Sequence, residues 1–138
     1  ELAAVLRTAR TRDAYGKVVQ LLTLTGQRLN QIASLRAEFI NAKDKTIAWP
    51  AELMKGNKPH TIPYGDMTAE LIKNRGGVLF TTEKGGPFNS WSKSKADFDK
   101  VCALPHWTLH DLRRTFASGW QRLGVGGYPF LKSQILSE

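Results

Sequence analysis

The chain has 138 residues, of which 41% are hydrophobic and 23% are charged, an ordinary composition for one folded domain. Its 20 lysines and arginines outweigh 12 acidic residues, so the formal net charge is +8, which favours a polyanionic partner such as nucleic acid. The absence of any run of about 18 apolar residues excludes a membrane-spanning helix, and no acidic cluster suits Mg²⁺.

Two helices separated by a short break are predicted near the beginning of the chain. Glu1–Arg12 is a charged amphipathic segment rather than a signal peptide, so we expect the chain to start inside a longer protein. In Asp13–Leu24 apolar residues recur at three- and four-residue steps, which indicates a helix. Thr25 and Gly26 interrupt this pattern, and a shorter apolar stripe over Leu29–Leu35 predicts a second helix.

A small β-hairpin is predicted next, because Thr46–Trp49 and His60–Pro63 are short β-like runs. Pro50 and Pro63 bound these runs, which favours edge strands since proline cannot donate to a sheet ladder. The connection Ala51–Pro59 contains Lys-Gly-Asn-Lys, and its Gly-Asn pair tolerates left-handed dihedral angles. The hairpin therefore has a positively charged turn.

Three more helices are predicted in the rest of the chain, at Asp66–Lys73, Ser90–Cys102 and Leu109–Leu123. The apolar positions of the second are Trp91, Ala96, Phe98 and Val101, and those of the third are Leu112, Phe116 and Leu123. After Gly124 the pattern decays. Helices dominate, so the predicted fold class is mainly α with a small antiparallel β-sheet (α+β), in a single domain over residues 1–138.

Cysteine and histidine, the usual ligands of zinc, are few in this sequence. Cys102 is the single cysteine and has apolar neighbours, which favours a buried core thiol and suits a reducing cytoplasm. His60 and His106 belong to no motif, and we interpret them as structural or surface residues. We therefore expect no metal site.

Two stretches place an arginine near the start of a predicted helix. Arg28 follows the break at Gly26, and a helix N-terminus with an adjacent guanidinium suits phosphate oxygens. His110 and Arg113 lie three residues apart and so share a helix face, whereas Arg114 falls on another, solvated face. Alone, Arg28 also fits an exposed residue near a helix cap, and the second stretch fits an ordinary surface helix.

The order of these motifs resembles the catalytic domain of the tyrosine recombinases, the phage-integrase family. Thr25–Arg28 (TGQR) is similar to the first arginine box of that family, and Leu109–Phe116 (LHDLRRTF) is similar to its second box. Lys55, eight residues ahead of Pro63, resembles the hairpin lysine of the family. The resemblance covers nearly all of residues 1–125, which leaves residues 126–138 as a divergent tail.

The resemblance implies that these side chains bind an anion, and that this anion is a scissile phosphodiester of double-stranded DNA. Arg28 and Arg113 would stabilise the negative charge that develops on the non-bridging oxygens. Lys55 would protonate the leaving 5′ oxygen, while its rival Lys58 better suits a backbone phosphate contact. His110 would hydrogen-bond the phosphate or assist proton transfer at the nucleophile.

Two positions depart from the family pattern. Gln31 stands where the family usually carries an acid, so we expect weaker preorganisation of the site, or compensation by another acid such as Glu38. The family's nucleophilic tyrosine lies well downstream of the second box, whereas Tyr128 comes directly after it in a Gly-Gly-Tyr-Pro turn. We interpret Tyr128 as a turn residue, so the chain would bind DNA but not cleave it alone.

The implied function is site-specific recombination or integration, in which the intact protein breaks and rejoins DNA through a 3′-phosphotyrosyl intermediate without a metal or other cofactor. The protein would be cytoplasmic and of bacterial or phage origin. The intact protein would act as a tetramer on DNA, while we expect this chain to be a monomer. The alternative is a DNA-binding module that uses the same basic face without chemistry. A generic basic helical protein would need both boxes and the hairpin lysine by coincidence.

Overall fold

The computed structural model describes residues 2–11, 14–54, 56–73, 79–80 and 91–122, without the side chains of residues 120 and 121. Within these ranges the α-helices are α1 (Leu2–Arg10), α2 (Ala14–Thr25), α3 (Leu29–Ala33), α4 (Asp66–Leu71), α5 (Trp91–Cys102) and α6 (Leu109–Arg122). The strands are β1 (Ile40–Asn41), β2 (Thr46–Trp49) and β3 (His60–Pro63), and Ala37–Phe39 and Ala51–Leu53 form short 3₁₀ helices.

The three strands form one antiparallel sheet in the order β1-β2-β3. Ile47 pairs with Ile62, and Trp49 pairs with His60. The predicted mainly α fold with a small antiparallel sheet is therefore confirmed. The expectation of two edge strands is wrong for β2, because β1 pairs with its other side. Pro50 follows the last residue of β2, so its missing N–H leaves that strand's ladder intact.

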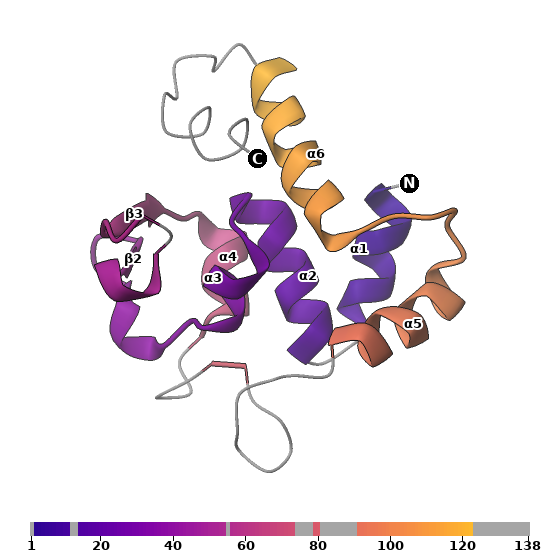
Figure 1. Ribbon diagram of the computed structural model, residues 1–138, viewed down its shortest axis with the longest axis horizontal. Coiled ribbons are helices and arrows are strands. Elements are labelled where there is room, and N and C mark those ends of the chain that lie inside the picture. The colour runs from indigo at the N-terminus through magenta and orange to yellow at the C-terminus, as the bar shows by residue number, and fades with distance from the viewer. Residues whose placement is uncertain (1, 12–13, 55, 74–78, 81–90, 123–138) are drawn as a thin grey trace.

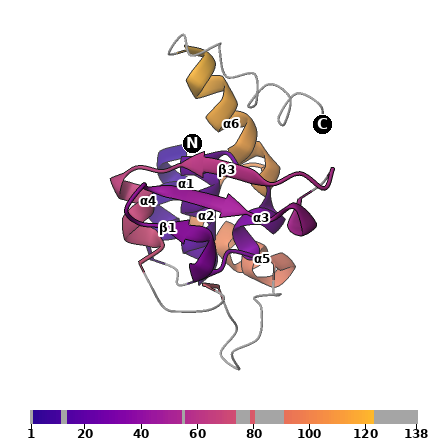
Figure 2. The ribbon, with the colours of Figure 1, turned by 90° about the vertical axis from the view of Figure 1, so that its left-hand side faces the viewer.

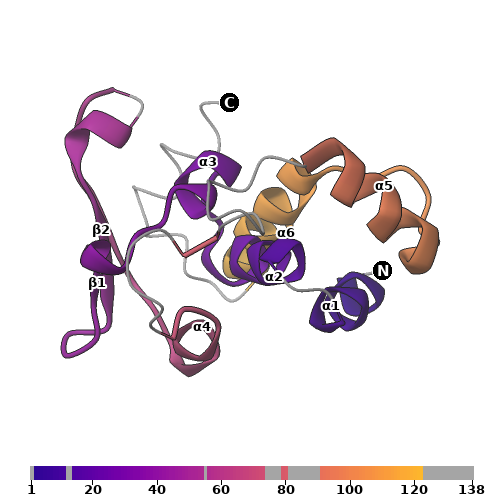
Figure 3. The same cartoon turned by 90° about the horizontal axis from the view of Figure 1, so that it is seen from below.

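The helices cover one face of the sheet (Figures 2 and 3). Side chains of β2 and β3 alternate, so that Ile47, Trp49 and Ile62 are buried while Ala48 and Thr61 are exposed. Seen from below, the sheet stands at one end, α3 and α4 come next, and α1 and α5 lie at the far end (Figure 3). The core therefore lies between the sheet and the helices and continues among the helices.

Helix α2 is the central element of the domain, and it contacts α1, α3, α4 and α6 (Figure 1). Val18, Val19, Leu21 and Leu22 are all at most 1% exposed, so this helix is buried on several sides. Helices that carry residues distant in sequence are thereby held against one common support. None of the helices in the described ranges has the length and apolar character needed to cross a membrane.

Helix α5 buries Phe98 and Cys102, which confirms the expected core thiol. Val101 was expected on the apolar face of this helix, but it is 58% exposed. The buried stripe runs through positions 98 and 102, four residues apart, and position 101 lies off this stripe. Tyr15 of α2 contacts Phe98 edge-on at 5.6 Å between ring centroids.

Candidate functional site

The turn between α2 and α3 is built around Gly26. This residue has φ +65°, and its N–H donates to the Leu22 carbonyl, so it ends α2 in the left-handed conformation that glycine tolerates best. A Cβ atom at Gly26 would clash with the ring of Phe116 on α6. The turn therefore combines a backbone conformation that favours glycine with close packing against the helix that carries the second box.

Arg28 follows this turn as the residue that caps α3, with extended backbone angles of φ −74° and ψ 152°. Its backbone N–H donates to Gln31 Oε1 at 2.8 Å. Gln31, which stands at the family's acid position, is buried, and its Nε2 lies 3.4 Å from Met54 Sδ. The amide thus fixes the backbone at Arg28. Glu38, the expected compensating acid, instead pairs with Arg36 at 2.6 Å on the surface.

The start of α6 is fixed by a reciprocal cap. Thr108 N–H donates to Asp111 Oδ2 at 2.8 Å, and Asp111 N–H donates to Thr108 Oγ1 at 3.2 Å. The backbone hydrogen bond from Thr108 holds the pKa of Asp111 below its usual value, although burial acts in the opposite direction. This cap sets the first turns of α6, from which His110 and Arg113 project.

Arg28, His110 and Arg113 line one pocket of about 320 Å³. Its other described lining residues are Leu22, Gln27, Leu29, Asn30 and Leu109. Arg113 is only 2% exposed, whereas His110 is exposed. The described lining includes two guanidinium groups and an imidazole but no carboxylate, so the pocket is suited to an anion. Arg114 lies outside the pocket with its side chain 67% exposed, which confirms the predicted solvated face.

The connection between β2 and β3 is described except at Lys55. The predicted role of that residue therefore falls outside the described part of the chain. Its neighbour Gly56 has φ +91° and Asn57 has φ +55°, which confirms that the Gly-Asn pair takes left-handed conformations. Lys58 is exposed. Tyr128 also lies outside the described ranges.

His60, which sequence reasoning left without a function, is buried beside the pocket. Its ring stacks on Trp49 at 5.8 Å between centroids, and its Nε2 lies 2.9 Å from Gln27 Oε1. Burial lowers the pKa of His60, and the positive charge of Arg113 lowers it further. The sequence did carry one signal, because alternation with Ile62 places His60 on the buried face of β3.

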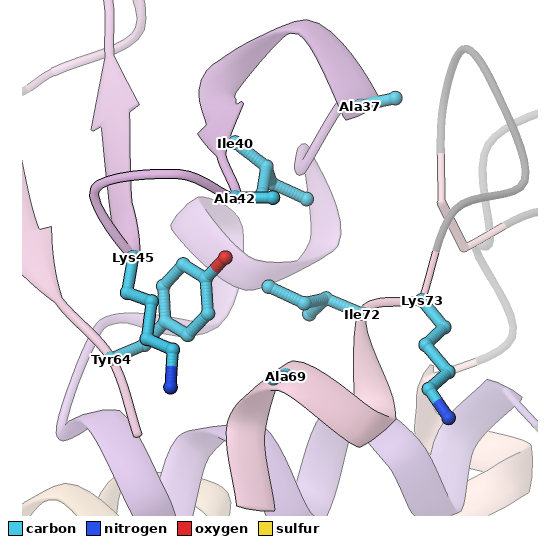
Figure 4. A pocket seen from close by; sticks show the side chains of 8 residues that line it. All are labelled: Ala37, Ile40, Ala42, Lys45, Tyr64, Ala69, Ile72 and Lys73. Atoms are coloured by element: carbon cyan, nitrogen blue, oxygen red, sulfur yellow. The ribbon is translucent and has the colours of Figure 1, made fainter. Parts of the chain in front are cut away.

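A second pocket, of about 400 Å³, lies between the sheet and α4 (Figure 4). Its lining is mainly alanine and isoleucine, and the Tyr64 hydroxyl points into it. The two lysines at this pocket are paired with acids, Lys45 with Asp66 at 2.7 Å and Lys73 with Glu70 at 2.8 Å. These lysines are therefore less suited to an anion than the arginines of the first pocket.

The described fold is that of the catalytic domains of recombinases and integrases. The crystal structure of XerA recombinase superposes with a TM-score of 0.74 at 19% identity, over 96% of this chain and 51% of that one. The catalytic domain of bacteriophage HP1 integrase gives a TM-score of 0.69 at 21% identity, over 99% of this chain and 76% of that one. The structure of the Tn1549 transposon integrase in complex with circular intermediate DNA gives a TM-score of 0.73 at 16% identity, over 96% of this chain and 54% of that one.

Sequence comparison identifies the family of the chain, which the fold alone does not. A family model described as "Phage integrase family" matches residues 1–126, so the chain belongs to the phage integrase family. Prophage integrase IntZ of Escherichia coli (strain K12) is 39% identical over 57 residues, which are 41% of this chain and 14% of that protein. This chain thus matches only part of the length of these relatives.

Proposed function

We propose that this chain is the phosphate-binding part of a site-specific tyrosine recombinase or integrase that acts on double-stranded DNA. The observation that carries the proposal is the convergence of Arg28, His110 and Arg113 on one pocket from the two motif boxes. The family membership and the net charge of +8 agree with it.

In the proposed reaction, a tyrosine hydroxyl of the intact protein attacks the phosphorus atom, and a Tyr Oη–P bond forms as the P–O5′ bond breaks. Arg28 and Arg113 stabilise the charge on the non-bridging oxygens, and loss of either would raise the barrier by on the order of 3 kcal/mol. His110 hydrogen-bonds the phosphate or accepts the tyrosine proton, and Lys55 protonates the leaving 5′ oxygen. The products are a 3′-phosphotyrosyl bond and a 5′ hydroxyl, without a metal or other cofactor.

We further propose that residues 1–138 form one domain with a divergent tail at 126–138. The chain would be a monomer in the cytoplasm of its bacterial or phage-infected host, and the intact protein would assemble as a tetramer on DNA. Tyr128 is not assigned as the nucleophile, because it follows the second box too closely. The chain alone is therefore expected to bind DNA without cleaving it.

DNA binding by the pocket is tested by measuring the affinity for a DNA duplex against salt concentration. Arg28→Ala and Arg113→Ala should each weaken binding and reduce the salt slope by about 1, because one phosphate contact is lost. Lys73→Ala removes the same charge at the second pocket and serves as the control. Equal losses in all three variants would contradict a localised phosphate site.

Catalysis is tested with a nicked suicide substrate that traps a covalent protein–DNA adduct. The chain alone should yield no adduct, and a longer form that includes any coding sequence after Glu138 should yield one. If the longer form binds DNA but never forms an adduct, the non-catalytic DNA-binding module is the correct function. An adduct with the chain alone would show that it holds its own nucleophile.

A further inference from the structure

A buried hydrogen-bond chain joins β3 to the turn that carries Arg28. Gln27 Nε2 donates to the Thr25 carbonyl at 3.0 Å, which fixes the orientation of the Gln27 side-chain amide. Its Oε1 therefore faces His60 Nε2 at 2.9 Å. An amide oxygen can only accept, so Nε2 of His60 must carry the proton. Gln27 is 3% exposed and His60 is 7% exposed, so water competes little with this bond.

The neighbouring strand makes a second contact with the same turn. Trp49 Nε1–H donates to the Gln31 carbonyl at 2.9 Å, and the Trp49 ring stacks on His60. The two strands of the hairpin thus contact Gln27 and Gln31, which flank Arg28 in sequence. The basic connection with Lys58 lies between these strands, so these two contacts help to place it relative to Arg28, together with the contact of Met54 Sδ with Gln31 Nε2.

We propose that His60 is a positioning residue of the recombination site. Its Nε2–H bond to Gln27 holds the lysine-bearing hairpin in a fixed position relative to Arg28 and Arg113. This inference rests on the function proposed above. Within the described part of the chain, Arg113 of α6 is a charged group that acts on the ring, whereas Trp49 of β2 and Gln27 of the turn are uncharged neighbours. An anion in the pocket offsets the field of Arg113, so its binding and the protonation of His60 are coupled.

The coupling is measured by NMR on the unmodified chain, with sulfate as a phosphate mimic whose charge is constant from pH 5 to 8. The ring ¹⁵N shifts of neutral His60 should show the Nε2–H tautomer. Saturating sulfate at constant ionic strength should raise the pKa of His60 by about half a unit, a factor of about three in protonation. The absence of such a shift would show that His60 is not coupled to the anion pocket.

Three variants separate positioning from packing. His60→Phe keeps the stacking on Trp49 but leaves a buried Gln27 oxygen without its donor, and should weaken DNA binding about tenfold. His60→Gln supplies an amide donor and should bind within about twofold of the unmodified chain. Thr61→Val changes the exposed face of the same strand and should bind normally. Melting curves establish that each variant is folded under the binding conditions.

The inference is overturned if His60→Phe binds DNA normally, if His60→Gln is as weak as His60→Phe, or if His60 of the unmodified chain does not respond to sulfate. The sulfate titration needs no variant, so the proposal stays testable if His60→Phe does not fold. Failure of the unmodified chain to bind DNA in a salt-dependent way would overturn the proposed function and this inference with it. Normal DNA binding with an unresponsive His60 would overturn the inference alone.

Discussion

Arg113 is the only Lys, Arg, Asp or Glu among the described residues that is buried, at 2% exposure. A charge removed from water costs free energy unless other groups compensate for it. In a stable surface helix such a residue would normally extend into solvent, as Arg114 does. The burial of Arg113 beside Arg28 and His110 agrees with the proposed function, which needs a preorganised cation.

His60 should make the stability of the chain depend on pH. Its pKa is lowered in the folded state, so the unfolded chain binds more protons below the ordinary value of 6.5. The free energy of unfolding should fall as the pH drops below 6.5, by at most about 1.4 kcal/mol per pH unit, and this contribution should be flat above about pH 7.5. Urea denaturation between pH 5.5 and 8 measures it.

The matched variant for this measurement is His60→Gln, which keeps a hydrogen-bond donor but does not titrate in this range. Its unfolding free energy should lose the component that falls below pH 6.5. An identical pH dependence in both proteins would show that other groups cause it.

At the scale of single residues, spacing predicted that His110 and Arg113 share a helix face, and the family resemblance implied that Arg28 joins them. The structure places all three in one cavity. The contacts of His60 and Gln27 were not predictable in the same way, because they depend on how β3 packs against a turn 33 positions away. Alternation along β3 indicated only that His60 is buried.

At the scale of elements, the turn at Gly26 should be intolerant of any side chain. Gly26→Ala adds a Cβ in a left-handed conformation and against the Phe116 ring, so we expect a loss of about 2–4 kcal/mol in unfolding free energy. Gly119→Ala is the control, because a Cβ there meets nothing within 4 Å in the interior of α6. It should stabilise the chain by about 0.5–1 kcal/mol. Chemical denaturation of both variants measures this difference, and similar destabilisation would contradict the turn's special role.

The cap of α6 is a second prediction at this scale. Thr108→Ala removes the hydroxyl that accepts from Asp111 N–H and should cost about 1 kcal/mol of unfolding free energy. DNA affinity should fall as well, since the first turns of α6 present His110 and Arg113. Thr115→Ala, on the exposed part of the same helix, should change stability by less than about 0.5 kcal/mol. Thermal unfolding and DNA binding measure these effects. If Thr108→Ala and Thr115→Ala changed both properties equally, a role for the cap would be contradicted.

Helix positions were predictable because periodicity and helix-breaking residues act locally. The predicted helix Leu109–Leu123 agrees with α6, whose described bounds are Leu109–Arg122. The two residues of β1 are too few to show alternation, so β1 was not predicted. Without β1, the central position of β2 could not be recognised, because only pairing on both sides distinguishes a central strand from an edge strand.

At the scale of the whole molecule, the fold brings both arginine boxes to one place because α2 supports α3 on one side and α6 on another (Figure 1). The proposed general acid, Lys55, is tested in the longer, cleaving form. The Lys55→Ala variant should not cleave ordinary DNA. It should still cleave a substrate that has sulfur in place of the bridging 5′ oxygen, because a thiolate leaves without a proton. The assignment of Lys55 as the general acid would be contradicted if Lys55→Ala cleaved both substrates equally poorly. It would also be contradicted if the sulfur substrate restored cleavage by Lys58→Ala but not by Lys55→Ala.

The central claim is that a single phosphate-like anion contacts both boxes at once. A crystal structure of the chain soaked with tungstate, whose scattering locates it unambiguously, tests this most directly. We predict one tungstate ion within hydrogen-bond distance of the side chains of Arg28, His110 and Arg113. Tungstate bound elsewhere with this pocket empty, or guanidinium groups directed to separate surfaces, would contradict the account.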